Sequence, residues 1–183
     1  MVSMRGGKLD FDAFVKRQQP AQERPVDWGK ERDEYLGKLE ELYHLVQTHL
    51  QKYIQSGEIS RSYRDTTLVE ENIGSYVARQ LVLKIGRKEV TFKPIGTLLI
   101  GTKGRVDVVG SAGQMRLAMV DRDATGPRVR VTVTVGPAKD TPKKEEPKEV
   151  HWIWKIITNP PDVRYVELTP ENIFEALMEV SGG

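Results

Sequence analysis

Two short segments with glycine at both ends constrain the fold more than any other feature of this chain. They are Gly101–Gly104 and Gly110–Gly113. Parallel neighbours in a sheet need a crossover of about a dozen residues or more, so connections this short predict antiparallel strands in sequential order, a β-meander. The strands that the two segments separate are expected at Thr97–Ile100, Arg105–Val109 and Gln114–Val120.

Alternation of apolar and polar residues extends the meander in both directions. A turn at Gly86-Arg87-Lys88 joins a strand at Val77–Ile85 to a return strand at about residues 90–94. Farther along, valine occupies every second position from Val129 to Val135. The last strands are expected at Val150–Ile157 and Val163–Leu168. The whole pattern predicts seven to nine short strands.

Helical periodicity flanks this strand-rich region. From Asp27 to Ser56 apolar residues recur at steps of three and four, with Asp27 placed as N-cap and Gly57 after the last turn. A short C-terminal helix is expected after Thr169-Pro170-Glu171, which supplies a cap, a first-turn proline and a first-turn acid. Because no helix alternates with the strands, we predict an α+β fold in which a long N-terminal helix and a short C-terminal helix cover an antiparallel sheet.

This pattern assigns residues 27–183 to a single domain. Residues 1–26 are expected to form an arm with one short helix at about residues 10–19, because prolines interrupt the rest of the arm. Residues 136–149 are rich in proline, lysine and glutamate and nearly free of apolar side chains. We expect them to form a mobile loop within the domain.

The composition excludes several classes of protein. The 183 residues include no cysteine and three histidines, which excludes disulfide scaffolds, cysteine-ligated zinc, iron–sulfur clusters and thiol catalysis. No cofactor is predicted. The N-terminus lacks the apolar stretch of a signal peptide, and no uncharged apolar run approaches the roughly 18 residues of a membrane span. We therefore expect a cytoplasmic protein that does not enter membranes, and we leave its oligomeric state open.

Charge is distributed unevenly along the chain. The formal net charge is +2, yet residues 79–130 contain 11 basic and 4 acidic residues, whereas both flanking segments are net acidic. Side chains of a sheet that do not face the core share the other face or the turns, so many of these cations could form one positive surface. The candidate binding residues are Arg79, Lys84, Arg87, Lys88, Lys103, Arg105, Arg116, Arg128 and Arg130, with Lys93 and Arg122 completing the excess.

The leading hypothesis is therefore a non-catalytic binding module whose basic sheet face contacts an acidic partner, either a protein or a nucleic acid. The alternative is that acidic helix flanks neutralise the sheet within the same molecule.

A competing hypothesis, a metal-dependent phosphoesterase or nuclease, depends on Asp107, Asp121 and Asp123. The string Asp121-Arg-Asp123-Ala-Thr125 after an apolar strand resembles the first motif of haloacid-dehalogenase-like phosphatases. That resemblance implies that Asp121 attacks phosphorus, that Asp123 acts as acid and base, and that Mg²⁺ lies between them. The downstream lysine and acidic pair of that family are missing. The string also begins like a calcium-binding EF-hand loop, but Thr132 replaces the final glutamate. We favour a polar turn in which aspartates cap backbone N–H groups.

Asp107, Gln114 and Arg116 resemble the metal site of restriction-endonuclease-like nucleases. Glutamine stands where that family has glutamate, and arginine stands where it has lysine; arginine holds its proton too strongly to serve as a base. An ion pair of Asp107 with Arg105 or Arg116 is the simpler interpretation.

Two tryptophans, Trp152 and Trp154, share one face of a predicted strand. They are expected either in the core under a helix or as an exposed aromatic platform.

Overall fold

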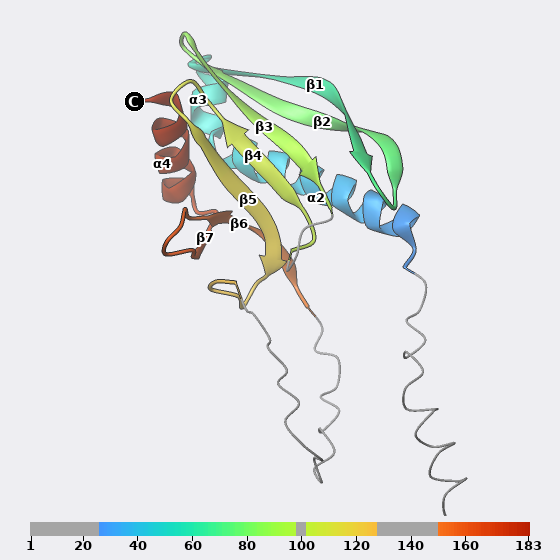
Figure 1. Cartoon of the computed structure of the whole chain (residues 1–183). Coiled ribbons are helices and arrows are strands. Elements are labelled where there is room, and N and C mark those ends of the chain that lie inside the picture. Colours follow the sequence, from blue (N-terminus) through green and yellow to red (C-terminus); the bar gives the residue numbers. More distant parts are fainter. Residues whose placement is uncertain (1–25, 98–101, 128–149) are drawn as a thin grey trace, which may run out of the picture.

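The computed structural model of the chain describes residues 26–97, 102–127 and 150–183 (Figure 1). The helices are α2 (Trp28–His49), α3 (Gln51–Gln55) and α4 (Pro170–Ser181). The strands are β1 (Ile59–Glu70), β2 (Gly74–Ile85), β3 (Lys88–Gly96), β4 (Arg105–Val109), β5 (Gln114–Asp121), β6 (Trp152–Ile157) and β7 (Tyr165–Glu167). No helix in the described residues has the length and apolar character needed to cross a membrane.

The seven strands form one sheet in sequential order, and every neighbouring pair is antiparallel. This confirms the α+β fold and the meander. The strands are not uniformly short, because β1 and β2 form a hairpin with 12 residues in each strand. That hairpin makes one end of the sheet, and the three-residue β7 makes the other (Figure 1).

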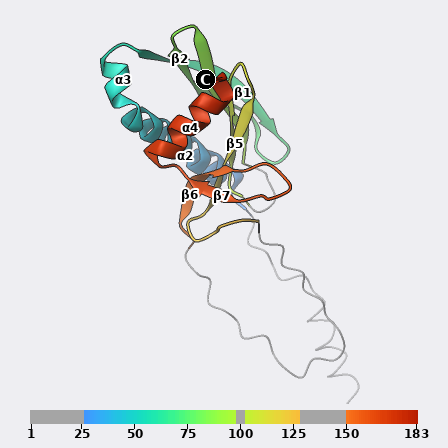
Figure 2. The ribbon, with the colours of Figure 1, turned by 90° about the vertical axis from the view of Figure 1, so that its left-hand side faces the viewer.

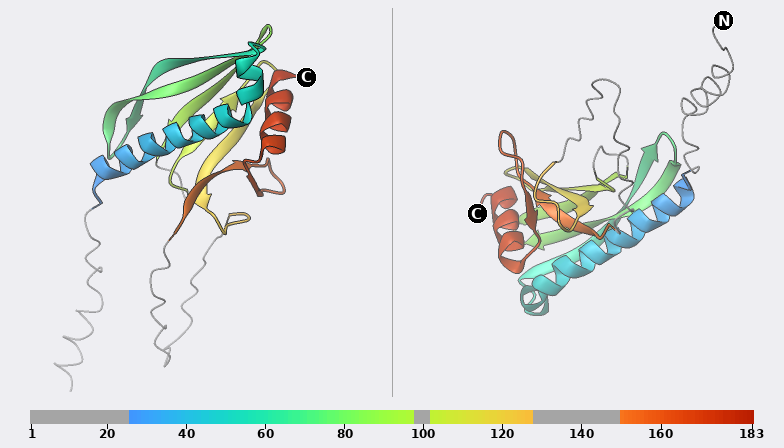
Figure 3. Two further views of the ribbon diagram at one scale, coloured as in Figure 1. Left: turned by 180° about the vertical axis from the view of Figure 1, so that it is seen from behind. Right: turned by 90° about the horizontal axis from the view of Figure 1, so that it is seen from below.

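The two faces of the sheet differ in their cover. Seen from behind, α2 crosses the sheet diagonally and α4 lies beside it on the same face, which we call the helix face (Figure 3, left). Figure 2 shows the same two helices from the side. Figure 1 looks onto the other face, which no helix of the described residues covers and which we call the open face.

The strand register assigns residues to the two faces. Side chains from every second position of β3 to β6, and of β2 from Leu81 onward, form one apolar cluster with α2 and α4 on the helix face. Nearer its start, β2 contributes Tyr76 and Ala78 to the same cluster, from the other set of alternating positions. The other strand members of the cluster include Leu81, Leu83, Val90, Phe92, Val106, Val108, Leu117, Met119, Trp154 and Ile156. The residues between them face the open side, where polar and charged side chains predominate on β3 and β4.

Local sequence explains the helix boundaries. The Asp27 side chain accepts a hydrogen bond from the Lys30 backbone N–H at 3.1 Å, as an N-cap does. Thr169 caps α4 in the same way, and Gly182 ends it in the left-handed region at φ 71°. The predicted continuous helix to Ser56 is wrong in one detail, because the backbone departs from helical geometry at Leu50 and α3 follows as a separate turn.

The edge strand β1 was not predicted from the sequence. It lies at the border of the sheet, and residues 60–65 are all exposed, so no alternation of apolar and polar residues marks it. Val77 was placed with the core residues of β2, yet it is 58% exposed, because in this part of the strand its neighbours Tyr76 and Ala78 face the core instead. Other predictions lie outside the described residues: the strand at Thr97–Ile100 except for Thr97, the strand at Val129–Val135, nearly all of the arm at 1–26 and the loop at 136–149.

Candidate binding surfaces

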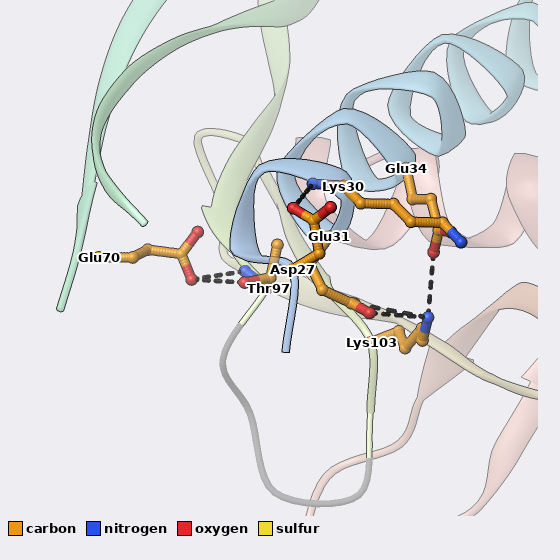
Figure 4. A network of polar contacts seen from close by, with 7 residues as sticks. All are labelled: Asp27, Lys30, Glu31, Glu34, Glu70, Thr97 and Lys103. Atoms are coloured by element: carbon orange, nitrogen blue, oxygen red, sulfur yellow. Dashed lines mark hydrogen bonds and ion pairs between the residues drawn. The ribbon is translucent and has the colours of Figure 1, made fainter. Parts of the chain in front are cut away.

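Two of the candidate cations are neutralised by carboxylates of α2. Arg79 on β2 forms an ion pair with Glu40 at 2.6 Å and lies over the Tyr63 ring at 4.7 Å. The hydrogen bond with Glu40 raises the pKa of Arg79. Lys103 contacts Glu34 at 3.1 Å and Glu31 at 3.4 Å. Burial works against the charge of Lys103, but these two glutamates raise its pKa (Figure 4).

The network in Figure 4 also fixes the two described ends of the connection between β3 and β4. Glu70 at the end of β1 accepts hydrogen bonds from the backbone N–H and the hydroxyl of Thr97, at 2.9 and 2.8 Å. Lys103 holds the other end against α2. These contacts give Lys103 a structural role within the domain.

Two further candidates bind groups of their own chain. Lys88 donates to the carbonyls of Ser181 and Gly182, at 2.5 and 2.9 Å, and so satisfies the C-terminal end of α4. Arg105 forms two hydrogen bonds with Asp107, from Nε to Oδ1 at 2.6 Å and from Nη2 to Oδ2 at 2.8 Å. This is one of the two partners that the sequence suggested for Asp107.

The remaining described candidates are exposed. Lys84 and Arg116 lie on the open face, as does Lys93 from the wider basic excess. Arg87 is exposed in the turn between β2 and β3. Arg128 and Arg130 lie outside the described residues. The structure therefore separates the described candidates into an internally paired set and an exposed set, which lies on the open face and in the turn between β2 and β3.

The structure does not bring the three aspartates together. Asp107 faces the open side opposite Arg116 on β5. Asp121 lies five positions farther along β5, which is roughly 17 Å at about 3.4 Å per residue, and its odd offset places it on the helix face opposite Trp152. Its carboxylate accepts a hydrogen bond from the Asp123 backbone N–H at 3.2 Å, as in the predicted polar turn. Among the described residues, no three potential metal ligands gather in one place.

Beyond the cations, a groove of about 820 Å³ runs between α2 and the β6–β7 end of the sheet. Its apolar lining comes from Leu42 and Leu45 of α2, from Trp152 and Trp154, and from Leu168. Charged residues at its rim include Lys38 and Glu41 of α2. Such a lining suits an aliphatic or aromatic group framed by polar contacts.

The two tryptophans contribute differently to this groove. Trp154 is buried, and its indole N–H donates to the Lys38 carbonyl at 2.8 Å, so it belongs to the core. Trp152 is half-buried, with the Lys103 ammonium 5.6 Å from its ring centre. Gly37 of α2 lines an adjoining hollow, and a Cβ there would meet nothing within 4 Å. The groove was not predicted from the sequence, where the two tryptophans, separated by one residue, were the feature that could have indicated it.

Comparison with known proteins gives this chain no family. No protein-family model matches it, and neither a curated protein nor a solved structure is significantly similar to it.

Proposed function

We propose that this protein is a non-catalytic interaction module that binds an acidic protein segment through the open face of its sheet. The observation that carries the proposal is the set of three exposed cations on that face, Lys84, Lys93 and Arg116.

Charge on the open face is unbalanced once internal pairs are removed. Glu89 is bound by Arg64 at 2.9 Å, and Asp107 is bound by Arg105. Within the described residues, Lys84, Lys93 and Arg116 have no ion-pair partner. Glu167 on β7 also lies on this face without an ion pair among the described residues, so these unpaired charges are three positive and one negative. The balance is positive, and a positive face attracts carboxylates.

The spacing of these cations allows them to act together. Lys93 lies opposite Asp107, and Asp107 lies opposite Arg116, so the two cations are two strand spacings apart. That separation is roughly 10 Å, about one Debye length at physiological salt. A chain with carboxylates along one edge can therefore interact with both cations at once.

The same face fits a protein segment better than a nucleic acid. Proteins that bind single strands stack bases on aromatic side chains, and the open face of β3–β7 carries one aromatic residue, Tyr165.

The test is binding of a labelled polyglutamate peptide, measured by fluorescence anisotropy at low and at physiological salt. The variant with Lys84→Gln, Lys93→Gln and Arg116→Gln is expected to lose at least tenfold in affinity. A matched variant with Lys30→Gln, Lys52→Gln and Arg164→Gln removes the same charge from other surfaces and should lose little.

Three outcomes contradict the proposal. They are absence of peptide binding by the native chain, equal loss in both triple variants, and tighter binding of single-stranded DNA than of polyglutamate. The last outcome would assign the open face to nucleic acid instead.

A further inference from the structure

The strand β1 forms a long outer edge of the sheet, and among the described residues no strand pairs with its outer side. β1 pairs with β2 along all 12 of its residues, in one continuous register from Ile59–Ile85 to Glu70–Gly74. A strand paired on one side presents every second backbone N–H and C=O outward. Figure 1 shows this strand at the border of the molecule.

Apart from the charged side chains of Arg61, Arg64, Asp65 and Glu70, the features that usually protect a sheet edge are missing from β1. Its sequence, ISRSYRDTTLVE, contains no proline, no glycine and no lysine, and its register with β2 has no bulge. At the opposite border, β7 has only three residues, so that edge offers little backbone to pair with. β1 is therefore the edge that is suited to pairing with another strand.

We propose that β1 pairs with β1 of a second copy of this chain, so that two seven-stranded sheets join across a two-fold axis. This inference is independent of the proposed function. An axis normal to the sheet places both helix faces on one side and both open faces on the other, so that the exposed cations of both copies face the same direction.

Symmetry restricts the register of such a pair. In an antiparallel pair, two residues that face each other either both point their backbone N–H and C=O groups toward the partner strand or both point them away. The two orientations alternate from one residue to the next along each strand. Opposed residue numbers must then add to an even number, and one residue meets its own copy on the axis. The candidate central residues lie near the middle of β1: Ser62, Tyr63, Arg64, Asp65 and Thr66.

Charge selects one of these registers. A centre at Arg64 or at Asp65 places like charges opposite each other, which is unfavourable. A centre at Ser62 or Thr66 places no opposite charges face to face within the strand. With Tyr63 at the centre, Arg61 of each copy lies opposite Asp65 of the other, which gives two pairs of opposite charge. Tyr63 then faces Tyr63 of the second copy, and residues 59–67 of each chain are paired.

The surroundings of these residues are consistent with that register. Arg61, Tyr63 and Asp65 all lie on the helix face, since they alternate along one strand, and all three are exposed. Arg61 borders a shallow hollow beside α2, with His44 and Thr48. No buried apolar surface has to be disrupted for the second copy to approach.

Two experiments on the full chain test the proposal. The first measures molar mass by light scattering across a concentration series, for the native chain and for Arg61→Asp. The single charge reversal is expected to weaken dimerisation at least tenfold, and the charge exchange Arg61→Asp with Asp65→Arg is expected to restore it. A monomer at every concentration, or failure of the exchange to restore the dimer, would overturn the proposal.

The second experiment uses the absence of cysteine from this chain. Facing residues in an antiparallel pair are about 4.5–5.5 Å apart at Cα, a distance that a disulfide can span. Tyr63→Cys is expected to cross-link two copies on mild oxidation, whereas Val69→Cys, 78% exposed on the same strand but outside the paired segment, should not. Equal cross-linking of the two variants would exclude this register.

Discussion

Arg105 and Asp107 lie two residues apart on β4, on the open face of the sheet. The Arg105 guanidinium donates two hydrogen bonds to the Asp107 carboxylate, one to each oxygen. The Arg105 side chain is 25% exposed and the Asp107 side chain 10%. One pair thereby removes a cation from the basic surface and a carboxylate from the hypothetical metal site.

Replacing Asp107 by alanine should destabilise the fold by about 1–3 kcal/mol, because it leaves the Arg105 guanidinium partly buried and without a partner. The control is Glu40→Ala, which breaks the exposed pair with Arg79 and should cost about 1 kcal/mol or less. Urea denaturation of both variants measures the difference. Equal losses would show that burial does not distinguish the two pairs.

The turn between β4 and β5 contains two glycines with opposite packing. A Cβ on Gly110 would lie 2.3 Å from the Val180 carbonyl oxygen of α4, whereas one on Gly113 would meet nothing within 4 Å. We expect Gly110→Ala to cost about 1–3 kcal/mol through the forced movement of α4, and Gly113→Ala to stay within about 0.5 kcal/mol of the native chain. Thermal unfolding of the two variants provides the comparison, and similar melting temperatures would contradict the close packing of the turn against α4.

Tyr35 joins α2 to the sheet through its hydroxyl. The hydroxyl donates to the Arg105 carbonyl at 2.8 Å and accepts from the Gly96 backbone N–H at 3.2 Å. Tyr35→Phe should lower the free energy of unfolding by about 1–3 kcal/mol, because both buried backbone groups lose a partner. Tyr53→Phe is the control, since that ring is 37% exposed and its hydroxyl makes no hydrogen bond within the described residues. A loss of the same size at Tyr53 would contradict the role assigned to the Tyr35 hydroxyl.

Alkaline pH should weaken the fold through three buried tyrosines. Burial raises the pKa of Tyr35, Tyr43 and Tyr76 above the usual value for tyrosine. The unfolded chain therefore releases these protons from about pH 10 upward while the folded chain keeps them, so stability falls as the pH rises past that point. Each such tyrosine contributes a slope of about 1.4 kcal/mol per pH unit.

Urea denaturation between about pH 9 and pH 11.5 measures how the free energy of unfolding changes with pH. Tyr43→Phe removes one of the three tyrosines and should reduce the slope by about 1.4 kcal/mol per pH unit. An unchanged slope in Tyr43→Phe would show that this hydroxyl ionises equally in both states.

Gly37 in the middle of α2 is expected to be a site where alanine stabilises the protein. Its Cβ position is open, so Gly37→Ala gains helix propensity without a clash, by about 0.5–1 kcal/mol. That gain corresponds to a rise of roughly 2–4 °C in melting temperature for a chain of this size. Gly29→Ala is the matched change in the first turn, where a Cβ would lie 3.4 Å from the capping Asp27 carboxylate and the gain should be smaller. A lower melting temperature for Gly37→Ala would contradict the open position.

The order of elements could be predicted from local pattern. The glycine-bracketed segment Gly110–Gly113 indicated the antiparallel turn between β4 and β5, and Arg105–Val109 was predicted with the bounds that the structure has. The caps at Asp27 and Thr169 were equally predictable, because each depends on residues three positions apart. β1 was not predictable, since residues 60–65 of this edge strand are exposed on both faces and lack the period that reveals other strands.

Local patterns in the sequence were enough to specify the meander, the two helices that cover it and the excess of basic residues in its centre. Which of those cations remain exposed depends on tertiary contacts. Arg79 meets Glu40 across 39 positions, and Lys103 meets Glu34 across 69. Local periodicity contains no information about such pairs, because they form only when α2 crosses the sheet and brings its glutamates to the strands.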